Sequence, residues 1–322
     1  PFVEPTPSAG RATVAMNPMG SEGFFSLPWP NDIRKKADGT LDLAGLPDNS
    51  NVVLRVVIDR VGASVSDFAT NGAIYLRTTA PIDPSTLPNP TSSVVPASPI
   101  LVVNVDDPTD RIPVVARVDR EDVFRPSNLI SLLPYPGHAM RSNARYVVAV
   151  TDALHAADGQ PLEPSWLIGA LDGDEWQGKA RSEGDWRALR RQRDEARAAL
   201  TALGVDPARL VGFTALHTQD SQRDLRAMAA TLDMVTIDPP TLTTLAACAA
   251  GTTSVGLSGT IRSPQFQAGA APFELDGGAI IVGADGRAVL RGWSTIPLEL
   301  SVPCGPSPVG GWPVVTWVNG TG

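Results

Sequence analysis

The chain has 322 residues, of which 43% are hydrophobic, so it is long and apolar enough for about two folded domains and is not a disordered chain. Its 26 basic and 34 acidic residues give a net charge of -8, which makes nucleic acid an unexpected partner. No run approaches the roughly 20 apolar residues of a transmembrane helix, so we expect no membrane span. Only 19% of the residues are charged, whereas 30 Pro and 29 Gly provide many turns, which favours a β-rich fold.

The cysteine content limits the metal chemistry and indicates a compartment. Cys248 and Cys304 are far apart and lack the CxxC spacing of a zinc site, and we expect no metal or cofactor. The pair fits a disulfide formed outside the cytosol, with two buried thiols as the alternative. Because the sequence starts at Pro1 rather than Met, we expect that a signal segment was removed. A secreted or cell-envelope location is the prediction.

The first half of the chain has the pattern of a small β domain. Residues 1–50 are expected to form an extended N-terminal segment, since prolines on both sides of Trp29 exclude a helix there. Residues 51–180 are expected to form an Ig-like β-sandwich, because short apolar runs alternate with Pro and Gly. The run at 52–58 is compatible with a helix or a strand. The strands expected here are 73–77, 100–105, 112–118 and 146–151.

Residues 181–245 are expected to form a connector of two helices. Apolar residues of 183–203 recur with helical spacing, and Gly204 stands where a helix C-cap is expected. A second helix is expected over about 218–233. The arginines between 187 and 197 alternate with Asp and Glu, which indicates a solvated, ion-paired helix face.

Residues 246–322 return to a β pattern and end in a glycine-rich turn. Strands are expected at 255–261, 278–283, 298–303 and 314–318, and Asp285-Gly286 predicts a hairpin turn. The turn Asn319–Gly322 has neither GxGxxG nor a GxxxxGK sequence, so it is not a recognisable phosphate cradle. It is compatible with the oxyanion loop of an α/β-hydrolase or with an ordinary hairpin turn.

Four groups of residues, in this order along the chain, carry a resemblance to a known family: Leu27–Asp32 with Asp38–Leu41, Tyr146–Asp152 with Asp158-Gly159, the interrupted pair Phe213-Thr214 and His217–Ser221, and Gly310–Val315 with Gly320–Gly322. They resemble the N-terminal region of bacterial extracellular lipases of the virulence-factor type and their α/β-hydrolase relatives. Each group is short, and their common order along the chain is what makes the resemblance specific.

The resemblance implies a mainly β fold with a helical connector, in which an N-terminal Ig-like β-sandwich precedes the first strands of an α/β-hydrolase sheet. It implies that Asn319, Gly320, Thr321 and Gly322 form the oxyanion loop, with Asn319 at the position where the family has His. The sequence contains no GxSxG nucleophile elbow. The resemblance therefore places the catalytic triad beyond residue 322 and implies two partners, a second polypeptide carrying the rest of the hydrolase domain and an ester substrate.

Other candidate residues within the chain have simpler interpretations. His138, His155 and His217 are the three candidate bases, and we interpret them as a loop residue, a strand-end residue and a helix-start residue. Asp106, Asp107 and Asp110 have the oxygen density of a calcium site but lack the Gly and Glu of an EF-hand loop. An acidic solvated turn is the preferred interpretation. The seven tryptophans are scattered, as core residues are, rather than gathered into a stacking surface.

Two hypotheses about function follow from the sequence. In the first, the chain is the N-terminal part of a secreted serine carboxylic-ester hydrolase, a lipase or esterase, and supplies a β platform and an oxyanion loop. In the alternative, it is a non-catalytic Ig-like binding or adhesion module, which accounts for the strands and cysteines without a second polypeptide.

Overall fold

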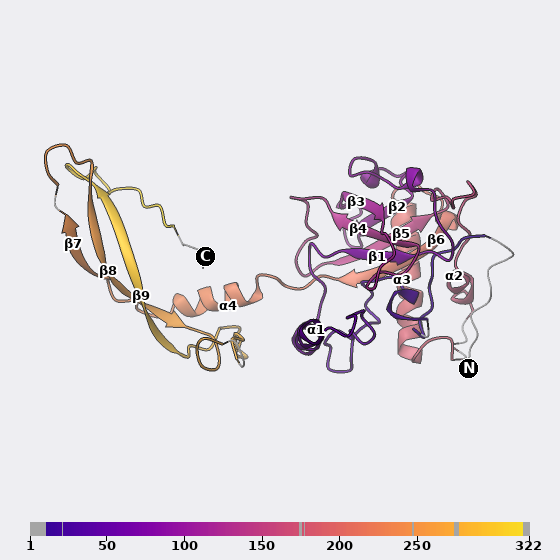
Figure 1. Ribbon diagram of the computed structural model, residues 1–322, viewed down its shortest axis with the longest axis horizontal. Helices are drawn as coiled ribbons and strands as arrows, with labels where there is room; N and C mark the ends of the chain where they lie inside the picture. Colours follow the sequence, from indigo (N-terminus) through magenta and orange to yellow (C-terminus); the bar gives the residue numbers. More distant parts are fainter. Residues whose placement is uncertain are drawn as a thin grey trace. The chain divides into compact units, whose positions relative to one another are not determined.

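The computed structural model describes residues 11–20, 22–173, 176, 178–246, 248–273 and 277–317. The chain divides into two compact units, Pro1–Ser221 (unit 1) and Gln222–Gly322 (unit 2), which are drawn in Figure 1. The sequence-based boundaries at 180/181 and 245/246 differ from this division. The two expected connector helices belong to different units, and a buried strand lies between them in the chain.

Unit 1 contains two three-stranded antiparallel sheets. The first has the order β1-β4-β3 and is formed by Ile74–Arg77, Leu129–Pro134 and Val114–Val118. The second has the order β2-β5-β6 and is formed by Ile100–Asn104, Arg145–Thr151 and Leu210–His217. Strands β1, β2, β3 and β5 confirm the sequence prediction, whereas β4 and β6 were not predicted.

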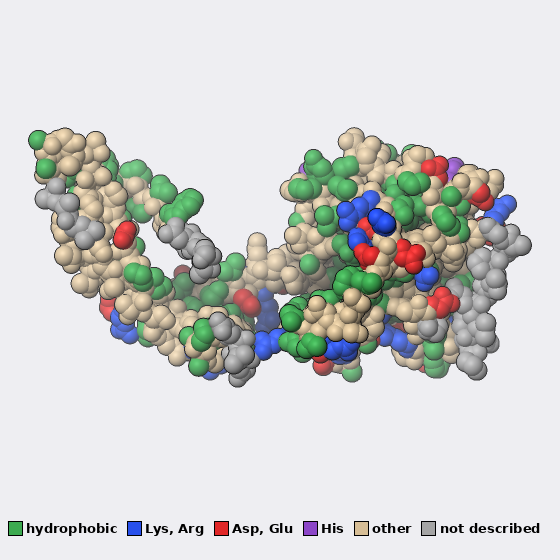
Figure 2. Space-filling model, in the orientation of Figure 1, with side chains coloured by type: hydrophobic (Ala, Val, Ile, Leu, Met, Phe, Trp, Pro, Cys, Tyr) green, Lys and Arg blue, Asp and Glu red, His purple; other side chains and the backbone are tan. Residues whose placement is uncertain are grey.

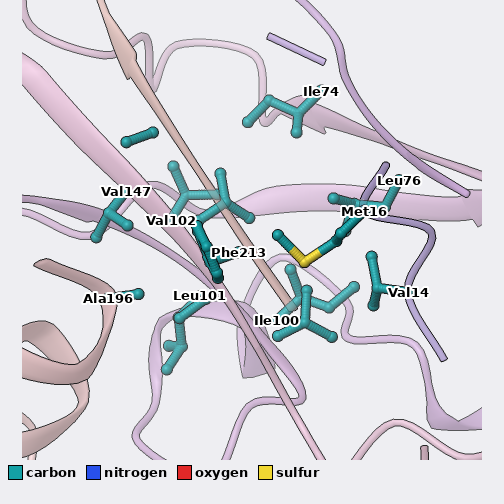
Figure 3. Packing of buried hydrophobic residues seen from close by; sticks show 14 of the residues in the cluster. Val14, Met16, Ile74, Leu76, Ile100, Leu101, Val102, Val147, Ala196 and Phe213 are labelled. Carbon is teal, nitrogen blue, oxygen red and sulfur yellow. The ribbon is translucent and has the colours of Figure 1, made fainter. Parts of the chain in front are cut away.

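Residues from both sheets share one hydrophobic core. Ile74 and Leu76 of the first sheet, and Ile100 and Phe213 of the second, are completely buried. Figure 3 shows Met16, from the N-terminal segment, lying beside Leu76 within this core. Strand β2 is buried along its whole length, as expected of a strand covered on both faces.

Helix α3 (Glu183–Ala202) covers the second sheet and contacts β5 and β6. The Ser182 side chain caps it by accepting a hydrogen bond from the backbone N–H of Asp185 at 3.0 Å. Its apolar face is buried through Trp186, Leu189 and Leu200, as the spacing predicted. Gly204 has a φ of 73° just beyond the helix, which is the left-handed geometry that glycine favours at a helix end.

The remaining helices of unit 1 are shorter and are α1 (Val52–Ser64), α2 (Trp166–Ala170) and four 3-10 turns at Phe24–Ser26, Pro84–Thr86, Ser92–Val94 and Pro207–Arg209. The run at 52–58, which was compatible with a helix or a strand, is part of helix α1. Its valines favour strands, but the Asn51 side chain caps the helix by accepting from the Leu54 N–H at 3.0 Å.

The N-terminal segment lies over the first sheet, as predicted. Trp29 forms a β-bridge with Tyr75 of β1, and its ring meets that of Phe68 edge to face at 5.2 Å. Phe24 and Phe25 are buried beside it. The segment is extended around Trp29, with one 3-10 turn at Phe24–Ser26.

Unit 2 consists of helix α4 (Arg223–Leu232) and a three-stranded antiparallel sheet in the order β7-β8-β9, formed by Thr241–Ala246, Ser254–Gln265 and Gly292–Pro303. The predicted strands at 255–261 and 298–303 are confirmed by β8 and β9. The prediction for 278–283 is wrong, since this run makes isolated bridges at Ile280 and Val282 rather than a regular strand. A small core around Ala227, Phe266 and Ala288 joins α4 to the loops near the sheet.

The prediction of a strand at 314–318 is not met in its described part, because residues 314–317 have no regular strand conformation. Its apolar side chains lie outside the β7-β8-β9 sheet. The predicted turn at Asp285-Gly286 is confirmed, with Gly286 at a φ of 77° and the Gly283 N–H donating to Arg287 O at 2.8 Å.

The helices of the described residues are short or carry charged side chains. None of them is both long and apolar enough to cross a membrane. This agrees with the absence of a long apolar run in the sequence.

Candidate functional site

Three of the four segments that carry the family resemblance meet in unit 1. The first is anchored by Asn31, which is completely buried and whose side-chain oxygen accepts from Gln192 Nε2 of α3 at 2.9 Å. The Thr214 hydroxyl of β6 donates to the carbonyl of Pro30 at 2.6 Å. The Leu27–Asp32 segment is therefore fixed between α3 and β6.

Asp32 joins this segment directly to β6, and to β5 through Arg145, the residue just before the second segment. Its backbone N–H donates to Ala215 O, and its carboxylate accepts from the His217 N–H, both at 3.0 Å and both in β6. The same carboxylate pairs with the guanidinium of Arg145, the first residue of β5. Arg145 also pairs with Glu195 of α3 at 2.8 Å. We call Asp32, Arg145 and Glu195 the Asp32 network.

The Asp32 network is largely buried, since its side chains are only 11%, 20% and 15% exposed. Burial by itself disfavours the charged guanidinium, but the hydrogen bonds and charges of Glu195 and Asp32 outweigh it and raise the pKa of Arg145. The network is thus a fixed, charged structural link between three elements. The sequence places Asp32 in a motif, but nothing in the sequence predicts its pairing with Arg145 or Glu195.

In the described part of the chain, His217 pairs with a carboxylate rather than with a serine. Its Nδ1 lies 3.4 Å from Asp67 Oδ1, and Asp67 also accepts from Lys35 Nζ at 2.5 Å and from the Ser66 hydroxyl at 3.2 Å. The Asp67 carboxylate therefore lies between Ser66 and the His217 ring. A catalytic serine must instead contact the imidazole directly. Burial raises the pKa of Asp67, but the bond and charge of Lys35 and the other partners prevail and lower it.

The other two histidines occupy loops. His138 is exposed, and its N–H donates to Tyr135 O in a tight turn. His155 is half-buried at the end of β5, where it forms a bridge with Pro161. Within the described part of the chain, no serine, threonine or cysteine side chain hydrogen-bonds a histidine ring. Those residues therefore assemble no Ser–His pair.

The acidic turn 106–110 is stabilised by protein groups. Asp107 accepts from the Thr109 hydroxyl at 2.5 Å and pairs with Arg141 at 3.1 Å, and both partners lower its pKa. Asp110 accepts from the Tyr146 hydroxyl at 2.6 Å and forms an ion pair with Arg141 Nε at 3.1 Å. Asp106 stands in the same turn, where its N–H donates to Asn104 Oδ1 at 3.0 Å. Among the described residues, no group of three or more His, Cys, Asp or Glu has the geometry of a metal site.

Tyr146 is buried beneath this turn. Its hydroxyl donates to Asp110 and accepts from the Arg141 N–H at 2.9 Å. Burial and the hydrogen bond to the Asp110 carboxylate raise the pKa of Tyr146 to about 12. The phenol therefore stays protonated and links β5 to the turn.

The arginine-rich face of α3 is ion-paired, as predicted, but it is not solvated throughout. Arg193 is 6% exposed and pairs with Asp172 and Asp194, both at 2.8 Å. Arg187, by contrast, is exposed beside Glu183. Trp186 of the same helix is buried, but Trp176, Trp293, Trp312 and Trp317 are exposed, so the expectation that the tryptophans are core residues is met by only part of the set. Figure 2 shows basic and acidic side chains interspersed on the visible face of unit 1.

In unit 2, the predicted disulfide between Cys248 and Cys304 is present, with a Cα–Cα distance of 5.9 Å. It links the chain after β7 to the end of β9. The predicted oxyanion-loop residues Asn319, Gly320, Thr321 and Gly322 lie outside the described residues. Directly before them, Val314, Val315 and Trp317 are 79%, 90% and 84% exposed, and hydrophobic side chains follow this stretch in Figure 2.

The comparisons with known proteins give no family. No family model matches the chain, and no curated protein matches it. A solved structure that matches is the surface layer protein SbsC, domains 1–6, with 8% identity and a TM-score of 0.22. The match covers 81% of this chain and 36% of that one. Similarity at this level carries no conclusion about fold, function or location.

Proposed function

We propose that this chain is the N-terminal part of a secreted serine carboxylic-ester hydrolase of the lipase or esterase type. Unit 1 serves as an Ig-like β platform. Residues 310–322 serve as the strand and oxyanion loop of an α/β-hydrolase sheet, and the serine, histidine and acid lie outside residues 1–322. The reaction of the whole enzyme is acyl transfer to water through a serine acyl-enzyme.

The observation that carries the proposal is the meeting of three resembling segments around Asp32. Asp32 of the first segment pairs with Arg145, which directly precedes the second segment, and the Thr214 hydroxyl of the third segment donates to the Pro30 carbonyl of the first across 184 positions. These segments follow one another in the same order as in the family, and in unit 1 they also hold one another in place. Both features support the proposal that this chain shares the family's architecture. The ester chemistry itself rests on the resemblance of Gly310–Gly322.

Two observations in unit 2 are consistent with this role. Val314, Val315 and Trp317 are apolar side chains that are largely exposed, as expected of a segment that packs against further protein. The Cys248–Cys304 disulfide supports a location outside the cytosol, because disulfides persist in oxidising compartments.

The test is labelling of the natively produced protein with a fluorophosphonate, which reacts with activated serines. Material captured through an antibody to unit 1 is labelled, denatured and separated, and p-nitrophenyl ester turnover is measured in parallel. Labelling of a polypeptide that is continuous with this chain, or associated with it, supports the proposal. Turnover that is insensitive to the fluorophosphonate, or no labelled polypeptide at all, contradicts it and favours the binding module.

A further inference from the structure

A cleft of about 900 Å³ in unit 1 lies where three loops meet, outside the four segments that carry the family resemblance. The loops contain residues 89–94, 109–113 and 135–138. Two hydrogen bonds from backbone N–H groups hold these loops beside the first sheet. The Val114 N–H donates to Ser93 Oγ at 3.0 Å, and the Tyr135 N–H donates to Pro113 O at 2.8 Å. Loops fixed on a rigid sheet in this way are the usual place for a binding site.

Arg111 places an available positive charge in the cleft. Its backbone forms a β-bridge with Val103 of β2, so its Cα is fixed. The carboxylates nearest in sequence, Asp107 and Asp110, both pair with Arg141 at 3.1 Å. Within the described part of the chain, the half-buried Arg111 guanidinium has no hydrogen-bond or ion-pair partner. An anionic ligand would supply that partner.

The neighbouring polar groups are also donors. The side-chain oxygen of Asn89 already accepts from the N–H groups of Thr91 and Ser92, each at 3.0 Å, which leaves its amide nitrogen to donate. The Thr91 and Tyr135 hydroxyls line the same cleft. No aspartate or glutamate is among the described lining residues. A cation and several donors without a carboxylate favour an anion over a cation.

The remaining lining residues provide flat and apolar surface. The rings of Tyr135 and His138 lie 6.0 Å apart at an interplanar angle of 41°, and Tyr135 is 45% exposed. Val94 and Pro113 add apolar wall. Apolar walls with a few convergent polar groups are typical of sites for small organic ligands. Such a surface suits the apolar face of a sugar ring.

We infer that this cleft binds a sugar that carries a carboxylate or a phosphate group. Arg111 binds the anionic group, Asn89 and Thr91 donate to the ligand's oxygens, and Tyr135 packs against its ring. The site goes beyond the proposed ester hydrolysis, since it uses none of the residues assigned to that reaction.

The test is isothermal titration calorimetry of the full chain with three probes. Trigalacturonate carries carboxylates, glucose 6-phosphate carries a phosphate, and galactotriose is neutral. We expect at least one anionic probe to bind and galactotriose not to bind. Which anionic probe binds more tightly identifies the anion that the cleft takes.

The decisive variant is Arg111→Gln, with Arg120→Gln as the matched control, because Arg120 is an exposed arginine of unit 1 outside the cleft lining. We expect Arg111→Gln to weaken the binding about tenfold or more and Arg120→Gln to leave it within about twofold. Tyr135→Ala, at an exposed side chain, is the second variant and is expected to weaken binding even if Arg111→Gln fails to fold. Equal losses in the two arginine variants, binding of galactotriose as tight as that of the acidic probes, or no binding of either acidic probe overturns the inference.

Discussion

Arg145, the first residue of β5, pairs with Asp32 of the N-terminal segment, although 113 residues separate them in the chain. Because Glu195 of α3 pairs with the same guanidinium, one side chain connects the N-terminal segment, the second sheet and the helix that covers it. The Leu27–Asp32 segment is thus part of the domain rather than an appendage.

Replacing Arg145 with Met is expected to lower the free energy of unfolding of unit 1 by about 3 kcal/mol, because it leaves two largely buried carboxylates without their cation. Arg187→Met is the control, since Arg187 and Glu183 are 71% and 63% exposed and their pair contributes below about 1 kcal/mol. Urea denaturation measures the free energy of unfolding of both variants. Equal losses in the two variants would show that the Asp32 network is not a structural link.

Tyr146 makes the free energy of unfolding of unit 1 depend on pH in the alkaline range. Its pKa in the folded protein is about 12, above the value of about 10 in an unfolded chain. Its contribution is therefore complete below about pH 10 and is lost as the pH rises from about 10 to about 12. Tyr146→Phe is expected to lower stability by about 1–3 kcal/mol at pH 8 and to decline less steeply between pH 10 and 11 than the wild type.

The control for this prediction is Tyr135→Phe, at an exposed tyrosine of the same unit. It is expected to keep the alkaline decline of the wild type. Urea denaturation at pH 8, 10 and 11 measures all three proteins. If Tyr146→Phe and the wild type decline in parallel, the buried phenol is not the group responsible.

Asp67 gives the corresponding prediction at acid pH. Its pKa is lowered in the folded protein, so its contribution is present above the unfolded value of about 3.9 and is lost as the pH falls through the folded pKa. Asp67→Asn is expected to destabilise unit 1 at pH 7 and to flatten the acid limb of the stability profile below about pH 4. Denaturation midpoints from pH 7 to pH 2.5 test this, and an acid limb as steep as that of the wild type would contradict it.

The Cys248–Cys304 bond closes a loop of 56 residues, for which the chain-entropy relation gives about 4 kcal/mol. The double variant Cys248→Ser with Cys304→Ser is expected to reduce amide protection in β8 and β9. Protection in β5 and β6 is expected to stay unchanged, because those strands belong to unit 1. Hydrogen exchange followed by mass spectrometry distinguishes the two sets of strands, and an equal loss in both would contradict the division into units.

The regular elements of unit 1 were predictable where local patterns decide them. Helix α3 ends one residue before its predicted end, and β2, β3 and β5 are runs of β-branched residues. Strand β6 was missed because Leu210–His217 follows Pro207 and is buried on both faces, so it lacks the alternation that marks a half-exposed strand. Because β6 was missed, the two helices on either side of it were expected to form one connector over 181–245.

The candidate sites, too, were predictable only where the composition or a local pattern determines them. The cysteine pairing was predicted from composition, since two cysteines have a single intramolecular pairing. The Asp32 network and the cleft around Arg111 depend on loops far apart in sequence, which no local pattern brings together. The strand expected at 314–318 failed in its described part because an apolar run becomes a strand only beside a partner.

The proposed oxyanion loop makes a kinetic prediction for the native enzyme. Gly320→Val adds a branched side chain where the backbone must approach the substrate carbonyl, and it is expected to lower kcat by about 100-fold or more, with a smaller change in KM. Val309→Thr, at a fully exposed residue nearby in the sequence, is the control and is expected to keep full activity. An unchanged kcat in Gly320→Val would remove this loop from the reaction.

The most direct test of the central claim is intact mass spectrometry, under denaturing conditions, of the native protein after fluorophosphonate treatment and an ester assay. We predict turnover that the inhibitor abolishes and one inhibitor adduct on a serine outside residues 1–322, either in a longer chain or in a second polypeptide that purifies with this one. An unlabelled single species near 33.8 kDa without esterase turnover would contradict the claim and identify the chain as a binding module.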